Sequence, residues 1–245
     1  MIERQIDIAT RDGSTTTFIC HPERGGPHPV IIFYMDAPAI REELRDMVRR
    51  LAAVGYYVML PNLYYRSGVM ELDDESRPRM FELMDSLTIA KVMEDTRALQ
   101  GFAAEDGAAS DGPMGVVGYC MSGPFAINAA AVFPDRIAAA ASIYGVRLAT
   151  QSDDSPHRVA GRAKGELYFA CAEIDRWAPM AMVETLAAAL PETGVDAEVE
   201  IYPGVEHGFA FPQRAAYDRD AAERHWERLF CLFRRRLGPA TSAGG

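Results

Sequence analysis

Apolar runs and amphipathic stretches alternate along the chain, and this alternation predicts the order of its strands and helices. The chain begins with two short strand-type segments, near residues 4–9 and 15–20, with Asp12-Gly13 as the hairpin turn between them. Further strands are expected at residues 30–34, 56–60, 114–117, 138–144, 166–171 and 197–202. Because helix-type segments separate these later runs, the pattern predicts a mostly parallel central sheet with helices on both faces.

The helices are recognised by apolar residues at helical spacing. They are expected around residues 44–55, 79–103, 126–133 and 178–190, and in a long C-terminal helix. That last helix carries an apolar stripe typical of core packing, formed by Trp226, Leu229, Phe230, Phe233 and Leu237. Gly238-Pro239 ends it. We expect one domain over residues 1–238 and a flexible tail over 239–245, with the irregular stretch 62–79 lying over a pocket.

Composition excludes several classes of function. A net charge of −10 argues against nucleic acid or an anionic membrane as the main partner. No apolar stretch has the length of a membrane span or the pattern of a signal peptide. The four cysteines are scattered without a CxxC pair, which argues against a disulfide framework or a zinc site and favours a reducing, cytoplasmic setting. Three of them lie in apolar contexts and are interpreted as packing residues: Cys20, Cys171 and Cys231.

The fourth cysteine lies where a predicted strand turns into a predicted helix. Cys120 stands in Gly118-Tyr119-Cys120-Met121-Ser122-Gly123, between the apolar run 114–117 and the helix that Pro134 ends. Small residues on both sides of a nucleophile at such a turn indicate a nucleophile elbow, here with Cys in the usual place of Ser. The alternative is a buried core thiol, the usual fate of a free cysteine.

A nucleophile needs a base, and the base needs an orienting group. Asp175 follows the strand 166–171, and His207 follows the strand 197–202 across a short loop. Since the carboxyl ends of parallel strands share one edge, both residues are expected beside Cys120. Glu173 is the alternative to Asp175. The order nucleophile, acid, histidine is that of α/β-hydrolases.

These residues predict acyl-transfer chemistry. The Cys120 thiolate would attack a carbonyl and form a thioester, while His207 transfers protons and Asp175 holds its tautomer. The backbone N–H groups of Met121 and Ala37 are the expected oxyanion donors. A second hypothesis is a catalytically silent or redox-sensing protein that uses a reactive Cys120.

The chain resembles the dienelactone hydrolase family of α/β-hydrolases over nearly its whole length. The matching segments are Gly118–Gly123, Leu60-Pro61-Asn62-Leu63-Tyr64, Asp175 with Pro179, and Pro203-Gly204-Val205-Glu206-His207-Gly208-Phe209. The resemblance implies hydrolysis of an enol-lactone in the breakdown of aromatic compounds, by a Cys-His-Asp triad without metal or organic cofactor.

The resemblance also implies residues around the triad. Asp36 matches a family Glu that hydrogen-bonds the thiol; alternatively, Asp36 caps a helix that begins near Pro38. Arg77 matches one of two arginines that bind a substrate carboxylate. The second arginine falls on Phe211 and a pocket tyrosine on Phe81, which predicts a more apolar pocket.

The expected substrate is therefore a small lactone or ester, either a dienelactone held by Arg77 or a neutral, apolar ester. Thioester hydrolysis and acyl transfer to a small alcohol stay open. The expected assembly is a monomer or a weak homo-oligomer.

Overall fold

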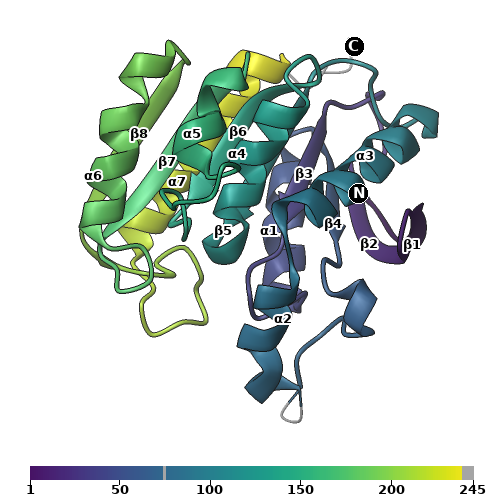
Figure 1. Cartoon of the computed structure of the whole chain (residues 1–245). Helices are drawn as coiled ribbons and strands as arrows, with labels where there is room; N and C mark the ends of the chain where they lie inside the picture. Colours follow the sequence, from purple (N-terminus) through teal and green to yellow (C-terminus); the bar gives the residue numbers. More distant parts are fainter. Residues whose placement is uncertain (74–75, 239–245) are drawn as a thin grey trace.

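The computed structural model describes residues 1–73 and 76–238, whose strands form one eight-stranded sheet (Figure 1). The strands are β1 (Ile2–Thr10), β2 (Gly13–His21), β3 (Val30–Tyr34), β4 (Tyr57–Pro61), β5 (Met114–Tyr119), β6 (Ile137–Ile143), β7 (Glu166–Ile174) and β8 (Ala197–Glu206). They lie in the order β1-β2-β4-β3-β5-β6-β7-β8. β2 pairs antiparallel with β1 and β4, and all other neighbours are parallel, as the alternation of elements predicts.

The first hairpin is one residue out of the predicted register. Thr10 pairs with Gly13, so the two turn residues are Arg11 and Asp12, and Gly13 already belongs to β2. Gly13 has φ 143°, a backbone conformation that favours glycine and explains its place directly after the turn.

Helices cover both faces of the sheet. They are α1 (Glu42–Ala53), α2 (Met80–Ser86), α3 (Ile89–Glu105), α4 (Gly123–Val132), α5 (Pro156–Val159), α6 (Met180–Ala189) and α7 (Arg219–Leu237). Short 3-10 turns lie at Tyr65–Ser67, Arg77–Arg79, Cys120–Ser122, Ala160–Arg162 and Pro191–Thr193. In Figure 1, α1 and α7 lie behind the sheet, and α3, α4 and α6 lie in front of it.

The core lies between these layers. The apolar stripe of α7 packs against β5, β6 and β7, with Trp226, Leu229, Phe233 and Leu237 buried and Phe230 half-buried. Close packing also explains Gly115 on β5, where an added Cβ would lie 2.7 Å from the Phe233 ring. The stripe is core packing, as predicted.

Two predicted helix boundaries are wrong. The segment 79–103 is two helices, because the chain leaves the helical conformation at Leu87 and Thr88, and the Thr88 side chain then caps α3 by accepting from Lys91 N–H at 3.2 Å. α1 begins at Glu42 instead of near Pro38, so Asp36 caps no helix.

The parallel strands place four side chains of interest at one edge of the sheet. Asp36 follows β3, Cys120 follows β5, Asp175 follows β7, and His207 follows β8. β7 and β8 extend beyond their predicted ends, so that β7 leads directly to Asp175 and β8 leads directly to His207. α2 and the chain around it lie at this edge, at the bottom of Figure 1.

No helix in residues 1–73 and 76–238 is long and apolar enough to cross a membrane. The predicted tail, residues 239–245, lies outside the described residues.

Candidate active site

The turn between β5 and α4 has the strained backbone expected of a nucleophile elbow. Cys120 has φ 55°, in the left-handed region that non-glycine residues rarely adopt. A Cβ at Gly118 would lie 2.1 Å from the Ser122 carbonyl oxygen, and a Cβ at Gly123 would lie 2.5 Å from Gly145 Cα. Small residues are therefore required on both sides of Cys120, and the thiol is half-buried at the carboxyl edge of the sheet.

Asp175 and His207 meet at the same edge. Asp175 Oδ1 accepts from the backbone N–H groups of Trp177 at 2.8 Å and Ala178 at 3.0 Å. The other oxygen, Oδ2, accepts from His207 Nδ1 at 2.6 Å. The Asp175 side chain is 1 % exposed, so its two oxygens are held in one orientation. This arrangement selects the His207 tautomer in which Nε2 is available to a reacting group.

Cys120 lies on the other side of the imidazole. His207 Nε2 is buried and has no hydrogen bond of ordinary geometry, yet Cys120 is near enough to influence the ring electrostatically. Burial disfavours the charged imidazole, but Asp175 and Cys120 outweigh it and raise the pKa of His207 to about 9. His207 therefore holds a proton near neutral pH and can transfer it to a reacting group.

Glu173, the alternative to Asp175, has a different partner. Its carboxylate accepts from the backbone N–H of Gly204 at 2.7 Å and thus ties the end of β7 to β8. Its side chain is exposed, whereas Asp175 is buried against His207. The geometry favours Asp175 as the partner of the imidazole.

A pocket of about 340 Å³ opens above Cys120. Its walls come from the loop after β3, from α2, and from the loops after β6, β7 and β8; they include Pro38, Met80, Met84, Asp85, Val146 and Arg147. Phe81 lines this pocket, 47 % exposed, with its ring 5.7 Å from that of Trp177. Arg77 lines a neighbouring depression instead, together with Arg41 and Arg214. The structure thus brings Phe81, but not Arg77, into the pocket of the cysteine.

Phe211 lies beneath the pocket wall and not in it. Its ring is fully buried, and the guanidinium carbons of Arg41 and Arg214 lie 4.8 and 4.5 Å from its centroid. Arg214 itself lines the pocket with Cys120 and His207. The prediction that Phe211 makes the pocket apolar is therefore wrong, because the phenyl ring serves as a platform for cations.

The pocket residues that the sequence reasoning missed include two arginines and a tryptophan: Arg147, Trp177 and Arg214. Trp177 lies two positions after Asp175, and Arg214 follows His207 by seven. For Trp177 and Arg214, proximity to a predicted triad residue in the sequence is the one signal that was available, and Arg147 has no such signal. Aromatic and basic residues are common in such loops. Whether their side chains point into the pocket depends on how the loop folds.

Asp36 is completely buried and bound by two arginines. Its Oδ1 accepts from Arg41 Nη1 at 2.5 Å, its Oδ2 accepts from Arg41 Nη2 at 3.2 Å, and Arg214 makes a second ion pair with Oδ2. Among the described residues, no hydrogen bond joins Asp36 to Cys120. The carboxylate is therefore held mainly by charge-assisted bonds to guanidinium groups.

The two predicted oxyanion donors lie beside one tyrosine. Tyr64 donates from its hydroxyl to the Ala37 carbonyl at 3.0 Å, and the same oxygen lies 3.2 Å from Met121 Sδ. Burial, with Asp36 and Cys120 nearby, raises the pKa of Tyr64, so the phenol keeps its proton and donates. Met121 is the second residue of the 3-10 turn, where an N–H has no helical partner.

Within the described part of the chain, no group of three His, Cys, Asp or Glu side chains is arranged to hold a metal ion.

A strained Cys elbow, a buried Asp–His pair and a mostly parallel sheet together define an α/β-hydrolase, and solved structures support this class. An acylaminoacyl peptidase of Pyrococcus horikoshii has the same fold, with a TM-score of 0.76, 16% identity and coverage of 100% of this chain but 43% of that one. The model of the dienelactone hydrolase family matches residues 15–237. The chain belongs to the dienelactone hydrolase family and is an ester or lactone hydrolase.

Individual relatives agree with this assignment. A candidate carboxymethylenebutenolidase of Methylorubrum extorquens is 28% identical over 96% of this chain and 81% of its own length. The crystal structure of a candidate dienelactone hydrolase from Klebsiella pneumoniae is 26% identical, with a TM-score of 0.83 over 95% of this chain and 98% of that one.

Proposed function

We propose that the chain hydrolyses a small carboxylic ester or lactone through a thioester on Cys120. The observation that carries the proposal is the left-handed backbone of Cys120, which holds its thiol at the strand edge near a histidine that Asp175 orients. A buried packing thiol has no need of such strain.

The reaction has two halves. In the first, the Cys120 sulfur adds to the carbonyl carbon, the carbon–oxygen bond of the ester breaks, and protonated His207 gives its Nε2 proton to the departing oxygen. In a lactone this oxygen stays attached to the acyl chain. In the second half, His207 takes a proton from water, the resulting hydroxide adds to the thioester, and the carbon–sulfur bond breaks to release the acid.

In both halves a negative charge develops on the carbonyl oxygen. The backbone N–H groups of Met121 and Ala37 are the proposed donors to it. The contacts of Tyr64 with both residues support this role, because one buried phenol restrains the two backbone segments relative to each other.

The charges in the pocket favour a substrate without a carboxylate. Arg147 forms an ion pair with Asp85 at 2.7 Å, and Arg214 forms one with Asp36. The pair with Asp36 is the tighter of the two, because Asp36 is buried whereas the pair of Arg147 with Asp85 is exposed. A substrate carboxylate would have to compete with these pairs, whereas a neutral ester contacts Phe81, Met84 and Trp177 without such competition.

The test is the pre-steady-state release of nitrophenol from 4-nitrophenyl acetate by the wild type and by Cys120→Ala. We expect a burst near one equivalent per wild-type chain and none from the variant. Turnover that survives in the variant contradicts the choice of nucleophile. Absence of both burst and turnover in the wild type, with rapid oxidation of Cys120 by peroxide, would favour the redox-sensing alternative.

A further inference from the structure

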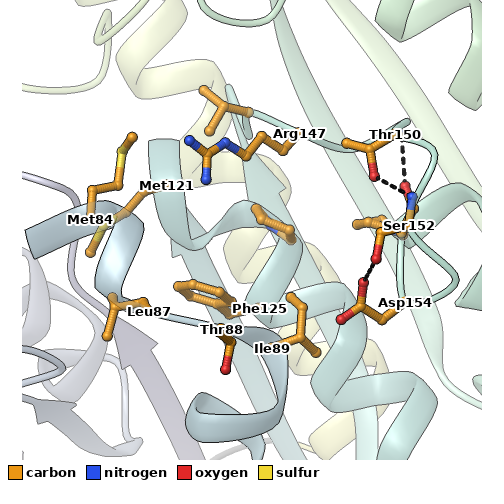
Figure 2. A pocket seen from close by; sticks show the side chains of 14 residues that line it. Met84, Leu87, Thr88, Ile89, Met121, Phe125, Arg147, Thr150, Ser152 and Asp154 are labelled. Carbon is orange, nitrogen blue, oxygen red and sulfur yellow. Dashed lines mark hydrogen bonds between the residues drawn. The ribbon is translucent and has the colours of Figure 1, made fainter. Parts of the chain in front are cut away.

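A second cavity adjoins the pocket above Cys120 and shares three wall residues with it. Its volume is about 230 Å³. Met84, Val146 and Arg147 line both spaces, so the two meet along this seam. Figure 2 shows the second cavity between the α2–α3 junction, the start of α4 and the loop that follows β6. The second cavity, called the side cavity below, therefore adjoins the catalytic pocket, with these three side chains as their common wall.

The lining of this side cavity is apolar next to the elbow and polar at its far end. In Figure 2, Met84, Leu87, Met121 and Phe125 gather on one side, and Thr150, Ser152 and Asp154 lie on the other. Met121, Phe125 and Leu87 are 3 to 9 % exposed, so they form a fixed floor. At the polar end Ser152 Oγ donates to Asp154, and Ser155 Oγ accepts from Thr150 N–H at 2.8 Å.

The apolar floor determines the kind of group that the cavity accepts. An uncharged hydrocarbon gains by leaving water for such a surface, whereas a buried charge would find no partner at the floor. A cavity of about 150 Å³ lined by aliphatic and aromatic side chains accommodates a benzene molecule. The side cavity is larger than this and has room for a phenyl ring or a short alkyl chain.

The position of the side cavity decides which half of the substrate enters it. The departing oxygen must lie at His207, which supplies its proton, and His207 lines the catalytic pocket but not the side cavity. Met121, the residue after the nucleophile and a proposed oxyanion donor, lines the side cavity. An acyl group bound to Cys120 with its oxygen near Met121 thus has the side cavity on the side away from His207.

We propose that the side cavity is an acyl-binding site, and that the enzyme prefers esters whose acyl group is a short alkyl chain or carries a phenyl ring. This inference rests on the proposed hydrolysis at Cys120 and names the substrate class for it.

The ion pair between Arg147 and Asp85 lies over the seam. It joins the loop after β6 to α2 at 2.7 Å, and both side chains are more than half exposed, 57 % and 60 %. Exposed ion pairs contribute little to stability and separate easily. The acyl group passes beneath a contact that can open without disturbing the core.

The experiment compares 4-nitrophenyl acetate, hexanoate and phenylacetate on wild type, Ile89→Trp and Ala90→Trp. Ile89 is half-buried and lines the side cavity, whereas its neighbour Ala90 is exposed and does not. Each buried methylene contributes about fourfold to binding. We expect Ile89→Trp to lower the hexanoate-to-acetate ratio of kcat/KM at least tenfold, and to lower the phenylacetate-to-acetate ratio by a similar factor. Ala90→Trp should change neither ratio more than twofold.

Ser152→Trp provides a second test at the exposed polar end of the cavity, where a change of fold is not expected. It should lower the hexanoate ratio threefold or more. Ratios that stay within twofold of wild type in both cavity variants overturn the acyl-binding site. The acyl-binding site is also overturned if the loss of kcat/KM in the cavity variants increases with the chain length of the alcohol in a series of alkyl acetates.

The burst with 4-nitrophenyl acetate distinguishes a failure of this inference from a failure of the proposed function. If the wild type gives a burst that Cys120→Ala abolishes and the ratios do not move, only the acyl-binding site fails. If the wild type gives neither burst nor turnover, the proposed function fails, and the inference fails with it.

Discussion

Asp175 and Asp36 are two buried carboxylates on either side of the elbow in the strand order, and they are held in different ways. Asp175 receives two neutral backbone N–H groups on one oxygen and offers the other to His207. Asp36 receives two guanidinium groups. A carboxylate that accepts hydrogen bonds from neutral N–H groups keeps its negative charge available to a neighbouring base. A carboxylate paired with two guanidinium groups interacts mainly with those two cations. The comparison supports the proposal that Asp175 orients the catalytic imidazole and that Asp36 supports the pocket wall.

The largest expected effect comes from Asp175→Asn. The amide can keep the bonds from Trp177 and Ala178, but its NH₂ group would face His207 Nδ1 and favour the wrong tautomer. We expect kcat for a nitrophenyl ester to fall on the order of 10³–10⁴-fold with little change in fold. The matched control is Glu173→Gln, which should retain activity within about twofold. Equal losses in both variants would contradict the assignment of Asp175.

A smaller effect, on stability, is expected for Asp36→Asn. Removal of the charge leaves Arg41 and Arg214 without their common partner, although both are only partly buried, with side chains 24% and 27% exposed. We expect the free energy of unfolding in urea to fall by about 3 kcal/mol. Glu82→Gln removes half of an exposed ion pair with Arg79 and should cost less than about 0.5 kcal/mol.

The same Asp36 variant distinguishes wall support from thiol activation. If Asp36 acts on the thiol, as the family resemblance implies, the rate of alkylation of Cys120 by iodoacetamide should fall along with kcat/KM. If it only supports the wall, alkylation should stay near the wild-type rate while KM rises.

A further prediction concerns pH. The pKa of His207 is about 9 in the folded chain against an ordinary value of 6.5, so the folded state holds this proton more tightly than the unfolded state. Its contribution to stability is complete below pH 6.5 and is lost as the pH rises through 9. We expect His207→Gln to reduce the loss of stability between pH 6 and pH 9.5 by about 3 kcal/mol, measured by urea unfolding. Parallel curves for wild type and variant would contradict a raised pKa.

The elbow was predictable because its signals are local. An apolar strand, a small residue two positions before Cys120, a Ser and Gly after it, and a helix behind it all lie within about twenty residues. The positions of Asp175 and His207 were predictable for a second reason: parallel strands bring their carboxyl ends to one edge whatever the loops do. The backbone strain at one residue and the direction of a strand are both determined by a short segment of the sequence.

The pocket wall was less predictable. The helical pattern continues through Leu87 and Thr88, and only the turn that Thr88 caps separates α2 from α3. Phe211 matched an arginine of the family by position, while the guanidinium group in the pocket comes from Arg214, further along the loop. In the folded loop Arg214 lies so close to Gly208 that an added Cβ there would lie 3.0 Å from the arginine. This contact can be found only when the fold of the loop is known.

The sequence by itself determined the class of fold, the order of the strands and helices and the strand edge at which Cys120, Asp175 and His207 meet, because periodicity, glycine and strand polarity act over short stretches of chain. The tertiary structure alone decided that Asp36 is saturated by two arginines, that Phe211 lies under the wall, and that a second cavity opens beyond Met121. These features depend on distances between loops far apart in sequence, and such distances are set by the packing of the whole domain.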